Sequence, residues 1–237
     1  VYITGVRNSG FFADFATIKY DAAGNLIWVR YYNGPENGFD ESKDIKVDLN
    51  GNVIVTGISA NRDGGLDAYD YATVKYDANG NLIWVQRYDG PANRWDEPRA
   101  IAIDATGNIY VTGWSASGDY MDDFSMMDYA TIKYDESGSL LWVQRYDGPG
   151  NNWDEARDIA VDALGNVYVT GKSWGSKVVG YATIKYDAGG AQVWVQRYDG
   201  PTFGGDGACA LAVDQPGNVY VTGWSFGFNG TGEQVSG

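Results

Sequence analysis

Hydrophobic residues in this sequence fall in short runs that alternate with polar turns, and the same runs recur along the chain. We name four types of run a, b, c and d, after the sequences DIAVD, NVYVTG, YATIKYD and LLWVQRYD. All are rich in Val, Ile, Tyr, Thr or Trp and are bounded by Gly, Asn and Asp, which is typical of β-strands. The b runs lie at Val1–Gly5, Val53–Gly57, Ile109–Gly113, Val167–Gly171 and Val219–Gly223.

The connections between these runs predict tight hairpins. An Asp-x-x-Gly-Asn sequence joins each a run to its b run, and Asp and Gly also bound each c–d connection. Asp can accept hydrogen bonds from its own turn, and Gly can adopt a positive φ. We therefore expect an antiparallel meander of four strands in each unit.

The predicted strands are apolar on both faces, so each sheet must be covered on both sides. Four-stranded sheets stacked around an axis meet this requirement, which favours a β-propeller. A solenoid is the alternative, although its units have fewer strands. The predicted fold is all-β, with four repeats and a partial fifth.

The run DEARDIAVDALGNVYVTG resembles the bacterial SBBP β-propeller repeat and is more distantly similar to NHL and YVTN repeats. The resemblance implies that a is the innermost strand and d the outermost. It also implies export, hence an extracellular or cell-surface location in a prokaryote. Repeats of this kind serve as scaffolds in many large proteins, so the resemblance does not define a function.

A single domain is expected over residues 1–237, with units at about 1–52, 53–108, 109–166 and 167–218 and a partial unit at 219–237. There are five b runs but four each of a, c and d. The a run near 208–214 could close a four-bladed ring with the first unit, or copies of the chain could complete each other. We expect instead a segment of a longer propeller, with four consecutive blades and the start of a fifth.

Length varies between units only in the b–c connections, at 6–14, 58–70, 114–128 and 172–180. The d–a connections, at 33–41, 89–97, 147–155 and 199–207, lie at the same end of a meander. We call this end the loop face and the opposite end the turn face. Because exposed variable loops on a rigid scaffold carry binding residues, function is predicted on the loop face and none on the turn face.

Aromatic residues in these loops are candidate sugar-stacking groups. They are Phe39, Trp95 and Trp153 in d–a connections, and Trp114, Tyr120, Phe124, Trp174 and Trp224 in or beside b–c connections. The alternative for the first three is wedging between blades. The repeated Trp28, Trp84, Trp142 and Trp194 are predicted to pack between blades, and the repeated Lys of c and Arg of d to form surface or interblade ion pairs.

Oxygen-rich loops make calcium the one cofactor to consider. One candidate set is Asp147, Asn151, Asp154 and Glu155, and a second is Asp119, Asp122, Asp123 and Asp128. The alternative is that Asp and Asn brace their turns while the Glu pairs with Arg99 or Arg157. No cofactor is required by the sequence.

Charge and composition exclude several classes of partner and mechanism. The net charge of −14 disfavours nucleic acid and anionic membrane as partners, and no apolar run is long enough to span a membrane. The single cysteine, Cys209, cannot form an intrachain disulfide and is expected to be buried. The chain has no histidine, which removes histidine-based triads and the usual zinc sites, so we expect it not to be an enzyme.

The leading hypothesis is an extracellular scaffold that binds a glycan or protein ligand on the loop face. The second is a structural protein of a surface layer, filament or adhesin, whose partners are other copies of itself. The third is a glycosidase-type hydrolase that uses paired carboxylates.

Overall fold

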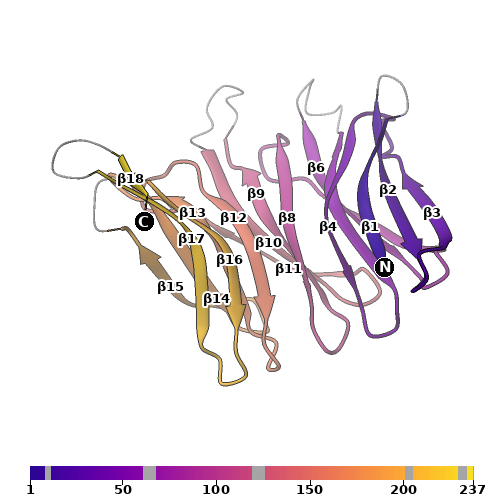
Figure 1. The fold of residues 1–237 in the computed structure, drawn as a ribbon. Coiled ribbons are helices and arrows are strands. Elements are labelled where there is room, and N and C mark those ends of the chain that lie inside the picture. The colour runs from indigo at the N-terminus through magenta and orange to yellow at the C-terminus, as the bar shows by residue number, and fades with distance from the viewer. Residues whose placement is uncertain (9–11, 61–67, 119–125, 201–204, 229–233, 237) are drawn as a thin grey trace.

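The computed structural model is all β and describes residues 1–8, 12–60, 68–118, 126–200, 205–228 and 234–236. Within these residues the strands form five antiparallel sheets, each of which follows the order of the chain (Figure 1). None of the described residues forms a helix of the length and hydropathy needed to cross a bilayer.

Three sheets have the complete a-b-c-d order. They are β4 (Asp40–Val47), β5 (Val53–Ala60), β6 (Tyr69–Tyr76) and β7 (Leu82–Tyr88); β8 (Asp96–Ile103), β9 (Ile109–Ala116), β10 (Met127–Tyr134) and β11 (Leu140–Tyr146); and β12 (Glu155–Val161), β13 (Val167–Trp174), β14 (Val179–Tyr186) and β15 (Gln192–Tyr198). The meander and the propeller-type blades predicted from the sequence are confirmed.

The two outer sheets have three strands each. The first contains β1 (Tyr2–Asn8), β2 (Ala13–Tyr20) and β3 (Leu26–Tyr32), and the last contains β16 (Asp206–Val213), β17 (Val219–Phe228) and β18 (Gln234–Ser236). Figure 1 shows the sheets side by side in a curved, open row with these two at opposite ends. In the described residues β16 pairs with β17 and not with the first sheet, so the a run near 208–214 does not close a four-bladed ring.

The hairpin turns form as the sequence predicts. In the turn after β6, Asp77 accepts hydrogen bonds through Oδ1 from the backbone N–H groups of Asn79 and Asn81. Gly80 adopts a φ of +82°, a backbone conformation that residues other than glycine rarely adopt. Equivalent glycines in the other hairpins also have positive φ: Gly24, Gly51, Gly107, Gly138, Gly165, Gly190 and Gly217.

Apolar side chains of the b and c strands fill the space between adjacent sheets. Val53, Val55 and Val74 are fully buried in one such layer, and Ile109 and Ile132 in the next. Burial on both faces explains why these strands do not alternate between apolar and polar residues.

In each of the first three sheets, a tryptophan and a lysine share one carbonyl of the next sheet. Trp84 Nε1 and Lys75 Nζ donate to Glu136 O at 3.1 and 3.2 Å. Lys75 is 1% exposed and also pairs with Asp48 at 3.4 Å. The same arrangement joins Trp28 and Lys19 to Ala78 O, and Trp142 and Lys133 to Ala188 O. The predicted interblade packing is confirmed for Trp28, Trp84 and Trp142. Trp194 differs, because its described ring contact is Tyr168 of its own sheet.

Cys209 differs from its prediction, because it is exposed. It stands on β16 in the repeat position that Lys43, Arg99 and Arg157 occupy in the preceding sheets. That position holds charged side chains elsewhere in the row and does not face the interior. The thiol therefore lies with polar residues and not in the core.

Candidate functional site

The b–c and d–a connections meet at one end of the sheets, as the meander requires. Backbone hydrogen bonds join them directly: Ala60 N donates to Phe39 O at 3.1 Å, and Phe226 N donates to Gly205 O at 3.0 Å. This end lies along the upper side of Figure 1. The candidate site on the loop face therefore draws residues from neighbouring sheets.

Four aromatic side chains form a continuous row on this face, and we call them the aromatic row. The ring centroids of Phe39 and Tyr69 are 6.2 Å apart, those of Tyr69 and Trp95 are 5.5 Å apart, and those of Trp95 and Trp114 are 5.5 Å apart. Phe39 is 38% exposed, Trp95 is half-buried and Trp114 is 4% exposed. The row therefore runs from the surface into a cluster in which Trp153 also packs.

Two indole N–H groups of the aromatic row are buried without a hydrogen-bond partner, those of Trp95 and Trp114. A buried indole N–H usually has an acceptor, and these two have none among the described residues.

The predicted site residues are only partly brought together. Trp174 and Trp224 are half-buried on β13 and β17 and are not part of the aromatic row. The ring of Trp224 instead contacts that of Phe226, with centroids 4.9 Å apart and a tilt of 43°. Trp114, Trp174 and Trp224 lie on strands and not in loops, because the b–c pairing continues beyond the Thr-Gly sequence, as in Trp114 opposite Tyr129. Tyr120, Phe124, Asp119, Asp122 and Asp123 lie outside the described residues.

A row of ion pairs borders Trp153. Glu97 pairs with Lys43 at 3.2 Å and with Arg99 at 3.0 Å. Glu155 pairs with Arg99 and Lys172 at 3.1 Å and with Arg157 at 3.4 Å, with its side chain 3% exposed. The ammonium group of Lys172 lies 3.6 Å from the ring centroid of Trp153. Glu155 is therefore held by ion pairs, the alternative to calcium binding that the sequence left open.

The other three residues of the first predicted calcium set do not form one site either. Asn151 adopts a φ of +43° and its N–H donates to Gly148 O at 3.0 Å, so it shapes the turn. Asp147 and Asp154 instead meet Asp128 of the second set, with carboxylate oxygens within 4.8 Å of one another. The structure thus recombines the two predicted sets into one group of three aspartates.

A second group of three aspartates, which the sequence analysis missed, lies one sheet earlier. It consists of Asp70 on β6, Asp89 after β7 and Asp96 at the start of β8, again with carboxylate oxygens within 4.8 Å of one another. Reading equivalent positions down the repeats would have found it, because each residue matches one of Asp128, Asp147 and Asp154.

Burial alters the acidity of both groups. Burial raises the pKa of Asp96 to about 7, with the negative charges of Asp89 and Asp70 acting in the same direction and the Ser115 hydroxyl and Gly90 N–H against it. The pKa of Asp154 is raised to about 6, again chiefly by burial.

The turn face was predicted to lack function, yet it contains a shallow hollow. Asp48, Asp104 and Glu136 are among its lining residues. Asp48 and Asp104 are used by their own turns, since each accepts hydrogen bonds from the asparagine four residues later. These two carboxylates therefore stabilise the turns that form the hollow.

Comparison with known proteins supports the repeat. The model of the β-propeller repeat SBBP matches residues 83–120 and 141–176. An uncharacterized WD repeat-containing protein L264 of Acanthamoeba polyphaga mimivirus is 28% identical over 65% of this chain and 11% of its own length. The regulatory protein FlaEY of Caulobacter vibrioides is 31% identical over 44% of this chain and 12% of its own length. The matched regions are thus about a tenth of these two relatives.

The fold also resembles solved structures. A protein of unknown function from Bacteroides caccae aligns over 99% of this chain and 71% of its own, with a TM-score of 0.51 and 12% identity. An endo-arabinase from Bacteroides thetaiotaomicron aligns over 99% and 87%, with a TM-score of 0.44 and 10% identity. The periplasmic gluconolactonase of Pseudomonas aeruginosa aligns over 100% and 82%, with a TM-score of 0.35 and 12% identity.

These structures correct the prediction, drawn from the lack of histidine, that the chain is not an enzyme. Proteins described as an endo-arabinase, a GH43 glycoside hydrolase and gluconolactonases are among its structural neighbours, at 10–13% identity, so the chain cannot be set apart from enzymes. The missing histidine removes particular mechanisms and not catalysis as such. At these identities the likeness is one of fold and assigns no reaction.

Proposed function

Because this chain carries β-propeller repeats of the SBBP family, we propose that it is a binding scaffold that holds a glycan on its loop face. The observation that carries the proposal is the aromatic row, in which Phe39, Tyr69, Trp95 and Trp114 are in successive contact. The proposal includes a location outside the cell or on its surface, in agreement with the export that the repeat family implies.

The chemistry of the aromatic row suits a sugar. Aromatic faces present apolar surface against which the C–H face of a pyranose ring can pack, while a polar edge supplies hydrogen bonds. The surface end of the row, at Phe39, gives a ligand its point of entry.

The test is isothermal titration calorimetry with cellohexaose, chitohexaose and mannohexaose. We expect one of these probes to bind and Trp95→Ala to weaken its binding at least tenfold, which corresponds to ~1.4 kcal/mol. Phe39→Ala is the second variant, because its exposed ring can be removed without opening the core. The matched control is Trp194→Ala, which removes a half-buried tryptophan of β15 outside the row.

The proposal fails if none of the probes binds, or if Trp95→Ala and Trp194→Ala weaken binding equally. Chromatography of the same mixtures would detect shorter oligosaccharides, whose appearance would identify a hydrolase at this face.

A second candidate function is association with further blades, from another copy or another chain. Tyr220 on β17 is 60% exposed, whereas Tyr110 and Tyr168 at the same repeat position are 0% and 1% exposed because the next sheet covers them. Light scattering over a concentration series tests this candidate. A growing mass that Tyr220→Ser reduces would support it, and a constant mass of one chain would contradict it.

A further inference from the structure

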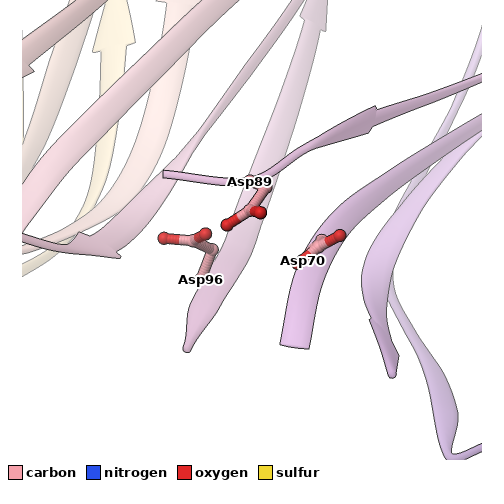
Figure 2. A group of neighbouring side chains, drawn as sticks. All are labelled: Asp70, Asp89 and Asp96. Carbon is pink, nitrogen blue, oxygen red and sulfur yellow. The ribbon is translucent and has the colours of Figure 1, made fainter. Parts of the chain in front are cut away.

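The three aspartates between β6, β7 and β8 come from separate segments but share one small space. An oxygen of Asp70, one of Asp89 and one of Asp96 all lie within 4.8 Å of one another. Figure 2 shows Asp89 between the other two, with its carboxylate toward that of Asp96. Asp70 and Asp96 are buried and Asp89 is exposed, so the space opens to solvent on one side.

Asp96, the most buried member of this group, has one carboxylate oxygen without a partner. Asp96 is 0% exposed, and its Oδ2 accepts a hydrogen bond from Gly90 N at 2.6 Å. Its Oδ1 has no hydrogen-bond partner. The Ser115 hydroxyl lies beside this carboxylate and lowers its pKa, and it accepts a hydrogen bond from Arg145 Nη1 at 2.5 Å. A fully buried carboxylate oxygen is costly to leave without a partner, and a bound cation would provide one.

The arginines described in this region pair with other aspartates. Arg87 Nη2 lies 2.8 Å from Asp70 Oδ2, and Arg145 Nη2 lies 3.0 Å from Asp128 Oδ2. The groups that favour the ionised form of Asp96 by hydrogen bonding are the Gly90 amide and the Ser115 hydroxyl. Both are neutral, so the buried negative charge of Asp96 is not compensated by them.

The repeat provides internal comparisons. Asp128, Asp147 and Asp154 form the equivalent group one sheet later, but there both oxygens of Asp154 accept hydrogen bonds, from Gly148 N and Trp174 N. Asp40 and Asp206, in the outer junctions, each keep a buried oxygen without a partner. Those junctions lack one carboxylate, however, because asparagine stands at 33 and glycine at 180.

We propose that Asp70, Asp89 and Asp96 bind a divalent cation, and that calcium is the ion that fits. Carboxylate oxygens are hard ligands that calcium prefers, and calcium–oxygen distances of 2.3–2.6 Å allow ligand atoms to be up to about 5 Å apart. The site joins β6 and the end of β7 in one sheet to β8 in the next, so the bound ion links two blades. This inference is independent of glycan binding.

The test is calorimetric titration of the full chain with calcium chloride after removal of metal with a chelator, together with thermal unfolding with and without calcium. We expect a dissociation constant on the order of 10⁻⁴–10⁻³ M, as in extracellular calcium modules, and a higher Tm in calcium. Asp89→Asn should weaken the binding at least tenfold, and because Asp89 is exposed this isosteric change should leave the fold intact.

The matched control is Asp199→Asn. Asp199 has the same place in its own repeat, but Gly180 there leaves only two carboxylates, and a Cβ at Gly180 would lie 2.0 Å from Asp199 Oδ1. This control should bind calcium like the unchanged chain. Equal losses in Asp89→Asn and Asp199→Asn would overturn the proposal and indicate unspecific attraction to an acidic surface. Absence of both heat and a Tm change at 5 mM calcium would also overturn it.

Discussion

Replacement of Trp84 by alanine should be among the most damaging single changes in the chain. Its indole is 9% exposed, lies 6.2 Å from the ring of Tyr134 in the next sheet and donates to Glu136 O at 3.1 Å. Truncation of a buried tryptophan costs about 3–5 kcal/mol. Glu136 O keeps Lys75 as a donor, so the lost hydrogen bond adds only about 1 kcal/mol and leaves no orphaned acceptor. We expect Trp84→Ala to lower the free energy of unfolding by about 5 kcal/mol.

Trp194 provides the comparison, because it occupies the same position in β15 but is half-exposed. Its described ring contact is Tyr168 in its own sheet, at 6.1 Å, so Trp194→Ala should cost about 1–2 kcal/mol. Urea unfolding followed by far-UV circular dichroism measures both, and the slope m shows whether each variant still unfolds as one unit. Equal costs at the two positions would refute the view that interblade packing stabilises the row of sheets.

Three further predictions concern turns and interblade hydrogen bonds. Gly138→Ala should destabilise the chain by about 2 kcal/mol more than Gly217→Ala. Both glycines have φ near +90°, but of the two only Gly138 would place its new Cβ against an indole, at 2.9 Å. Thermal unfolding compares the two variants, and equal losses of stability would contradict the clash. Asp44→Ala should cost about 1–3 kcal/mol, because it leaves Ile101 N, now 2.9 Å from Asp44 Oδ2, without an acceptor; urea unfolding measures the cost, and no change would show that the bond is dispensable. Hydrogen bonds from Asn81 lower the pKa of Asp77, so its contribution to stability is present above pH 3.8 and is lost as pH falls through the lower folded pKa; the destabilisation by Asp77→Ala should therefore shrink between pH 5 and pH 2, and a constant difference would refute this linkage.

Local features of the fold could be read from the sequence because they depend on local chemistry. The hairpin at Asp77–Asn81 forms from its own residues, and Gly80 has the positive φ that its position in the turn requires. Contacts between sheets were harder to foresee. Lys75 was expected at the surface or in an ion pair, and its ion pair with Asp48 is present, but it is 1% exposed because it also reaches a carbonyl of the next sheet.

The candidate sites show the same division. The sequence identified Phe39 and Trp95 as loop-face aromatics but not Tyr69, which joins them and stands on β6. It grouped aspartates by their nearness in the chain, whereas the structure groups Asp128 with Asp147 and Asp154 from three segments. Which carboxylates meet depends on the packing of successive sheets, and that is not a property of any single loop.

The pairing of each strand with its neighbour in the chain has a consequence for how the protein is made. Every pair of adjacent strands in the five sheets joins consecutive segments, so no sheet has to wait for a distant part of the chain. Contacts between nearby segments close small loops at low entropic cost. During synthesis the strands of each blade can pair soon after its d strand leaves the ribosome. The interblade hydrogen bonds of its tryptophan and lysine form only when the next c–d hairpin has been made. We therefore expect the blades to fold in their order along the chain.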